Sequence, residues 1–138
     1  LGQVYQAGTL SGNPVAVAAG LAALACVQQE GFYRELARKT ERLTAPIKEA
    51  IRQKNLNACL QQTGSMFSLF FGLTKVRSFE DLKALDIPLF GKFFRFLFEE
   101  GVYIPPSPRE AWFVSAAHTD EQIDYTSKKI VSFLQSMV

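Results

Sequence analysis

The sequence has few of the residues that build metal sites and disulfide frameworks. Its 138 residues include two cysteines, Cys26 and Cys59, and one histidine, His118. So few thiols and imidazoles give no metal-ligand spacing and no pattern of paired cysteines. The sequence therefore excludes a zinc module and a disulfide-stabilised secreted domain, and we expect a reducing, cytoplasmic compartment.

Net charge and long apolar runs are also scarce. A formal net charge of +2 does not by itself predict a nucleic-acid or membrane surface, so we expect neither as a partner. The Ala-rich run after Pro14 is too short and too rich in small residues to span a bilayer convincingly. There is no charged-then-apolar leader, and Leu1 is not a natural start. We therefore expect the chain to be a piece of a longer protein.

The segment with the most evident chemistry is the loop Gly8-Thr9-Leu10-Ser11-Gly12, followed by Asn13-Pro14. Asn is a favoured N-cap and Pro is favoured at the first helical position, so a helix is predicted to begin at Pro14. Free N–H groups at that helix start, with the hydroxyls of Thr9 and Ser11, would suit a phosphate. The same pattern also suits a capped helix after a tight turn, and it is neither a Walker motif nor a dinucleotide fingerprint.

Hydrophobic periodicity predicts an alternation of helices and short strands. Helices are expected at 14–29, 32–54, 79–85 and 89–100 and after the capping box Thr119-Asp120-Glu121-Gln122, and strands at 58–63, 65–71, 102–104 and 112–116. Helix 14–29 is apolar on all sides and is predicted to be buried, whereas Pro46 should kink or interrupt helix 32–54. This order indicates an α+β fold, with a small antiparallel sheet and helices packed on one face.

Two side chains merit attention as candidates for chemistry. His118, the lone histidine, lies where a strand is predicted to meet a helix cap, a position where a histidine is usually structural. Glu110 lies beside Arg109 in a Pro-rich loop between two predicted strands. Functional side chains concentrate in loops held by a scaffold, although the residues alone favour the simpler interpretation of Glu110 as an exposed carboxylate at a loop tip.

Several motifs together resemble the glutamate-1-semialdehyde 2,1-aminomutase family, pyridoxal-phosphate proteins of the class-III aminotransferase group. The run from Tyr5 to Pro14, continued by Val-Ala-Val-Ala-Ala-Gly-Leu, carries the resemblance most specifically. It recurs in Gly64-Ser65-Met66-Phe67, Phe93-Phe94, Glu99-Glu100-Gly101-Val102-Tyr103, Glu110-Ala111 and Ala117-His118-Thr119. The resemblance covers nearly the whole chain, in the order that the family has.

The resemblance implies a fold and a set of partners. Residues 1–31 would be the tail end of a large cofactor domain, with the phosphate loop and a buried helix near a subunit interface. Residues 32–138 would be the C-terminal small domain of a fold-type-I pyridoxal-phosphate enzyme. The full-length protein would be a cytoplasmic homodimer that acts on a small molecule.

The resemblance also implies an activity: isomerisation of glutamate-1-semialdehyde to 5-aminolevulinate in tetrapyrrole (porphyrin) biosynthesis, with pyridoxal 5'-phosphate as cofactor. Gly8 and Thr9 would bind the cofactor phosphate, with Thr9 reaching across the dimer, and Glu110 would lie near the substrate pocket. The family commonly has a Gln-Phe type pair where this chain has Pro108-Arg109.

The family's covalent cofactor lysine and its pyridine-nitrogen carboxylate lie upstream of the Gly8 loop. We therefore expect no catalytic residue in this chain, no activity of the chain alone and no tight binding of the cofactor by it. The alternatives are the same region of another class-III aminotransferase, which would be a transferase, or a non-catalytic anion-binding or interaction module.

Overall fold

The computed structural model describes residue 4 and residues 7–137. The chain divides into two compact units, Leu1–Tyr33 and Arg34–Val138. The assignment of residues 1–31 to a large domain and of 32–138 to a small domain remains a prediction.

The main element of the first unit is helix α1 (Pro14–Val27), which begins where the Asn-Pro pair predicts. The Asn13 side-chain oxygen accepts the N–H groups of Val15 and Ala16, at 3.0 and 3.2 Å. No residue of α1 is buried, and Val15 is 77% exposed. The predicted burial of this apolar helix therefore stays an expectation for the full-length protein.

The second unit contains a three-stranded antiparallel sheet in the order β1-β2-β3. Strand β1 (Ala58–Thr63) pairs with β2 (Met66–Phe71) in a register that places Ala58 opposite Phe71. The hairpin turns at Gly64, whose φ of +55° lies in the left-handed region that favours glycine. Strand β3 (Trp112–Phe113) adds to the other edge of β2.

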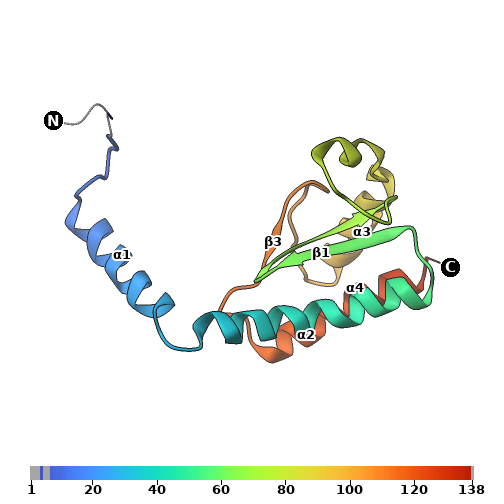
Figure 1. Ribbon diagram of the computed structural model, residues 1–138. Coiled ribbons are helices and arrows are strands. Elements are labelled where there is room, and N and C mark those ends of the chain that lie inside the picture. Colours follow the sequence, from blue (N-terminus) through green and yellow to red (C-terminus); the bar gives the residue numbers. More distant parts are fainter. Residues whose placement is uncertain (1–3, 5–6, 138) are drawn as a thin grey trace. The chain divides into compact units, whose positions relative to one another are not determined.

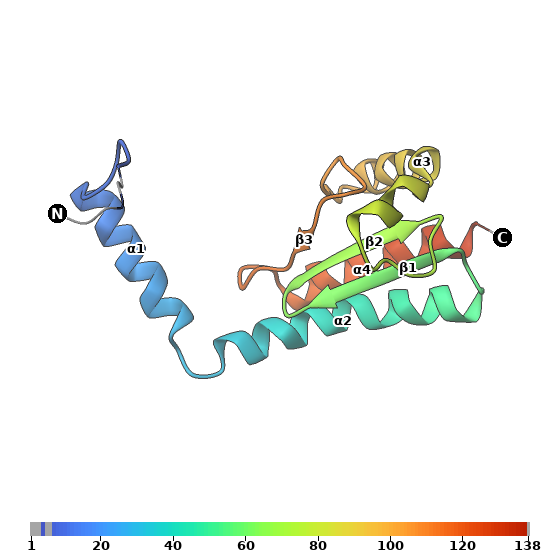
Figure 2. The ribbon, with the colours of Figure 1, turned by 45° about the horizontal axis from the view of Figure 1, so that its top comes forward.

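Three α-helices pack against one face of this sheet: α2 (Phe32–Gln53), α3 (Ile87–Glu99) and α4 (Asp120–Gln135). Figures 1 and 2 show α2 and α4 side by side along the sheet. Phe67, Leu69 and Phe71 alternate along β2 toward the shared core, whose other main members are Ile47, Phe93, Leu97, Ile123, Ile130 and Leu134. This arrangement confirms the predicted α+β fold with helices on one face.

A smaller cluster occupies the opposite face of the sheet. There Phe70 packs with Leu82 and Leu85, which belong to the short 3-10 helix η1 (Phe79–Ala84) and the residue after it. The alternation of Phe70 with its two neighbours in β2 explains why this strand is apolar on both faces.

Three expected features differ from the structure. Helix α2 continues through Pro46 without interruption; Pro46 is exposed, so water can reach the carbonyl of Arg42 that loses its helical partner. Residues 102–104 form no strand, because the Val102 N–H bonds to the Leu97 carbonyl at 2.8 Å and closes the end of α3. Strand β3 is two residues long because the chain turns at residues 115–118.

The cap of α4 is a local feature whose contribution to stability can be measured. The Thr119 hydroxyl accepts the Gln122 N–H at 3.3 Å, and the Gln122 side chain accepts the Thr119 N–H at 2.9 Å. This confirms the predicted capping box. We expect Thr119→Ala to lower the free energy of unfolding by about 1 kcal/mol, because one N–H at the helix start loses its partner. Chemical denaturation measures the change, with the exposed Ser132→Ala in the same helix as control; equal effects of the two substitutions would contradict the assignment.

Candidate functional site

The loop before α1 consists of two successive turns. The Ser11 N–H bonds to the Gly8 carbonyl at 3.0 Å, and the Asn13 N–H bonds to the Leu10 carbonyl at 3.1 Å. Gly12 has a φ of +75°, which favours glycine. A Cβ atom at Gly8 would lie 2.8 Å from the Ser11 hydroxyl oxygen, which can rotate away. The sequence therefore forms two tight turns, and the positive φ of Gly12 is the feature that favours glycine.

The hydrogen-bond donors of this loop differ from those expected. The N–H groups of Val15 and Ala16 already donate to Asn13, so the start of α1 does not offer them to an anion. This corrects the expectation that free N–H groups of the helix form the phosphate site. Thr9 and Ser11 are exposed, and neither hydroxyl bonds to a residue in the described ranges. The binding of a phosphate by Gly8 and Thr9 stays a prediction.

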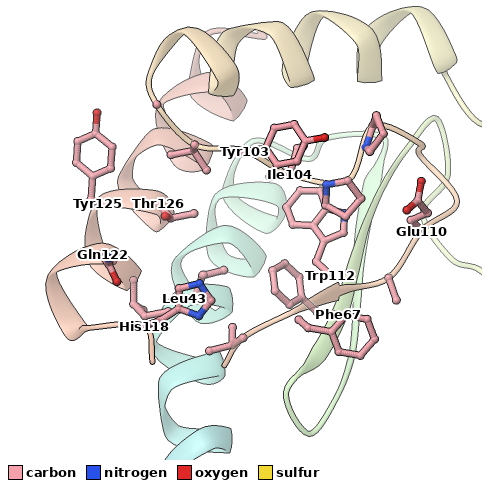
Figure 3. A pocket seen from close by; sticks show the side chains of 18 of the residues that line it. Leu43, Phe67, Tyr103, Ile104, Glu110, Trp112, His118, Gln122, Tyr125 and Thr126 are labelled. Atoms are coloured by element: carbon pink, nitrogen blue, oxygen red, sulfur yellow. The ribbon is translucent and has the colours of Figure 1, made fainter. Parts of the chain in front are cut away.

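The second unit contains a cavity of about 880 Å³. Its walls are the loop 101–106, β3 with its flanking residues, and the first half of α4 (Figure 3). Five aromatic side chains belong to the lining: Phe67, Tyr103, Trp112, Phe113 and Tyr125. A concave, mainly apolar site with a few polar groups is the usual form of a small-molecule site.

Glu110 borders this cavity from the loop that leads into β3. Its backbone is held by the Ser68 hydroxyl, which donates to the Glu110 carbonyl at 3.3 Å, and by a bond of 3.3 Å from its N–H to the Ser107 carbonyl. The carboxylate is exposed. Its role in a substrate pocket remains a prediction. Gly8 and Thr9 lie in the first unit and Glu110 lies in the second.

His118 also borders the cavity, and its side chain holds a turn. Its Nδ1 accepts the Ser115 N–H at 2.9 Å and lies 3.2 Å from the Ser115 hydroxyl. Because the backbone N–H must donate, Nδ1 is an acceptor and the neutral ring carries its proton on Nε2. Lys39 fixes the same turn by donating to the carbonyls of Ala116 and His118, at 2.9 and 2.6 Å. Sequence spacing indicated no partner for His118, although Ser115 is three residues away.

An ion cluster joins α2 to the start of α4. Arg38 and Arg42 both pair with Asp120, and Arg42 also pairs with Asp124 at 2.6 Å. The bond from Arg42 holds the pKa of the Asp124 carboxyl below its usual range. The cluster fixes the end of α4 that forms one wall of the cavity.

The Arg42–Asp124 pair predicts a pH dependence of stability. Because the pKa of Asp124 is lower in the folded state, its ionised carboxylate stabilises the fold above the ordinary Asp pKa of about 3.9. This stabilisation is lost as pH falls through the folded-state pKa. We expect Asp124→Asn to lower the unfolding midpoint at pH 7 and to have a progressively smaller effect below about pH 4. Denaturation of both proteins across this range measures it, and an equal difference at pH 7 and pH 3 would show that the ion pair is not responsible.

The lysines do not have the environment of a reactive amine. Lys39 donates to carbonyls, and Lys48, Lys83 and Lys129 each pair with a glutamate. The bond to Glu100 raises the pKa of Lys129, whereas a nucleophilic lysine needs a lowered pKa. Within the described ranges, no group of three His, Cys, Asp or Glu side chains could hold a metal ion. In those ranges no single helix is long and apolar enough to cross a membrane, and only α1 and α2 taken together reach the required length and composition.

Comparison with known proteins gives extensive similarity to one family. No protein-family model matches the chain. The chain is 53% identical over 135 residues to a glutamate-1-semialdehyde 2,1-aminomutase from Protochlamydia amoebophila, covering 98% of the chain and 31% of that protein. It is 51% identical over 126 residues to the enzyme of the same name from Laribacter hongkongensis, covering 91% of the chain and 30% of that protein. The chain thus spans about a third of the length of these relatives.

Solved structures agree with this similarity. A β-phenylalanine aminotransferase from Variovorax paradoxus matches with a TM-score of 0.84 and 30% identity, over 99% of the chain and 31% of that protein. A glutamate-1-semialdehyde aminomutase variant from Pseudomonas aeruginosa in complex with PMP matches with a TM-score of 0.83, over 100% of the chain and 31% of that protein. Its identity of 21% supports the fold alone. The chain therefore belongs to the glutamate-1-semialdehyde 2,1-aminomutase family of class-III aminotransferases, and it corresponds to about the C-terminal third of these proteins.

Proposed function

We propose that the full-length protein converts glutamate-1-semialdehyde to 5-aminolevulinate and that this chain is a non-catalytic part of it. One observation carries the proposal: identity of 53% to a named aminomutase extends over 98% of the chain. Such similarity includes both the loop before α1 and the cavity-lining segment around Glu110. Fold similarity alone would not distinguish an aminomutase from an aminotransferase.

Pyridoxal phosphate, when bound, would carry the amino group and delocalise the electrons released at the reacting carbon. This chain would contribute binding and orientation. Thr9 would donate its hydroxyl to the phosphate, and Gly8 would let the phosphate approach the backbone. Glu110 would accept a hydrogen bond from the substrate's ammonium group at the edge of the cavity. The aromatic walls would exclude water from the site and so strengthen these polar contacts.

The partner and the compartment are part of the same proposal. In a homodimer, the exposed apolar surface of α1, including Val15, Leu21 and Leu24, would be covered by protein. Thr9 at the start of that helix would then reach a cofactor bound mainly by the other subunit. A cytoplasmic location agrees with the two free cysteines, Cys26 and Cys59.

The proposal can be tested in cells that cannot make 5-aminolevulinate. Expression of the complete reading frame that encodes this chain should restore growth without added 5-aminolevulinate. The same frame ending before Leu1 serves as the control and should not restore growth. If only added 5-aminolevulinate restores growth, the proposed function is wrong, and an aminotransferase of the same family becomes the better interpretation.

A further inference from the structure

Trp112 is a largely buried side chain whose indole N–H has no partner in the described part of the chain. The side chain is 6% exposed, and it packs face to face with Phe93 and edge-on to Phe67. The indole Nε1–H donates to no acceptor in the described part of the chain. The nitrogen itself is not fully enclosed, so water or a ligand can supply its acceptor.

The Nε1–H faces the cavity rather than the closed core. Trp112 borders the cavity, and Figure 3 shows its indole ring in the wall between Tyr103 and Phe67. No fully enclosed side-chain nitrogen or oxygen in residues 7–137 lacks a hydrogen-bond partner. Since Nε1 has no protein acceptor, it must therefore be open to the cavity. An oxygen or another acceptor placed there would satisfy it.

The charges around the cavity decide which kind of acceptor fits. Two carboxylates border it, from Glu110 and Glu121, and hydrogen bonds from its own backbone N–H and from Thr119 hold the pKa of Glu121 below its usual value. No lysine or arginine in the described ranges borders the cavity. As the acceptor at Trp112, a carboxylate would meet like charges from Glu110 and Glu121, whereas a neutral carbonyl oxygen would not. The carboxylates suit an ammonium group on the same ligand.

We propose that Trp112 is a specificity-determining residue that binds the neutral carbonyl oxygen of an amino-carbonyl ligand through its Nε1–H. Glu110, two residues earlier in the loop that leads into β3, would take the ligand's ammonium group. This inference rests on the proposed function, because it places a substrate or product of that reaction in the cavity. It adds to that function the group that recognises the carbonyl.

The test compares two probes that differ only in that oxygen. 5-Aminolevulinate has a ketone at its fourth carbon, and 5-aminopentanoate has a methylene there. Titration calorimetry on the cofactor-free full-length protein measures the affinity for each. We expect a preference for 5-aminolevulinate that falls by about twofold to tenfold in Trp112→Phe, the range that one hydrogen bond supplies. Tyr33→Phe is the matched control, because Tyr33 is exposed and is not among the residues that border the cavity; it should keep the wild-type preference.

A second variant distinguishes loss of the N–H from the loss of packing that Trp112→Phe also causes. A benzothienyl-alanine at position 112 keeps the bicyclic shape and replaces the N–H with sulfur, and it should lose the preference to the same extent. In the wild type, the NMR chemical shift of the Trp112 indole N–H proton should change when 5-aminolevulinate is added and should not change when 5-aminopentanoate is added. An unchanged preference in both variants, an equal loss of affinity for both probes, or no binding of either probe would overturn the inference. Growth rescue by the full-length gene tests the proposed function and does not depend on the role of Trp112. Its failure would therefore count against the proposed function and not against this inference alone.

Discussion

The chain of residues 1–138, produced alone, is expected to give no detectable conversion of glutamate-1-semialdehyde. Catalysis with pyridoxal phosphate needs a lysine that binds the cofactor covalently. Lys39 donates to carbonyls, and Lys48, Lys83 and Lys129 pair with glutamates. The one lysine among the described residues whose pKa is clearly shifted, Lys129, has it raised. A complete loss of activity relative to the full-length protein is the largest effect that we predict.

Turnover and absorbance of the chain with added cofactor measure this expectation. The full-length protein at the same concentration is the positive control, and both should be tested with saturating pyridoxal phosphate. We expect neither product nor a stable cofactor band in the visible spectrum of the chain. A stoichiometric visible adduct that maps to one lysine among residues 1–138 would refute the assignment of this chain as non-catalytic.

Substitution of Thr9 by valine in the full-length protein should weaken cofactor affinity by about tenfold to a hundredfold. Valine keeps the shape of threonine and removes only the hydroxyl, which would otherwise donate to a charged phosphate. Such a hydrogen bond contributes about 1.5–3 kcal/mol, and 1.4 kcal/mol corresponds to a factor of ten. The hydrogen bonds from Ser11 to Gly8 and from Asn13 to Leu10 join only backbone atoms. The loop should therefore keep its conformation in the Thr9→Val variant.

Cofactor titration of the variant and the wild type measures this change. Thr63→Val, at the exposed end of β1, makes the same substitution away from the Gly8 loop in sequence and should leave the affinity unchanged. If Thr9→Val also has no effect, the Thr9 hydroxyl belongs to a turn and not to a phosphate site.

Local signals in the sequence predicted the elements whose ends depend on adjacent residues. The Asn13-Pro14 pair, the Gly64 hairpin and the Thr119 capping box are each completed by hydrogen bonds or backbone angles within a few residues. The expected strand at 102–104 was wrong because the closure of α3 at Gly101 takes the Val102 N–H. That competition depends on the three-dimensional end of a helix, which hydrophobic alternation does not reveal.

The candidate site was predictable only in part. The sequence indicated Glu110, and the structure places it at the edge of the cavity. It also indicated hydroxyls in the Gly8 loop, but it did not reveal that Asn13 takes the N–H groups at the start of α1. Trp112 read as an ordinary strand residue, because the lack of an acceptor for its N–H depends on packing from three separate segments.

The central claim, that this chain belongs to an aminomutase, is tested most directly by one turnover measurement. The purified full-length protein with pyridoxal phosphate is given glutamate-1-semialdehyde as the sole substrate, with no 2-oxo acid as amino acceptor, and 5-aminolevulinate is quantified. Our account predicts sustained multiple turnover under these conditions, because an aminomutase needs no second substrate. Product formation only after a 2-oxo acid is added, or no product in either condition, would contradict it.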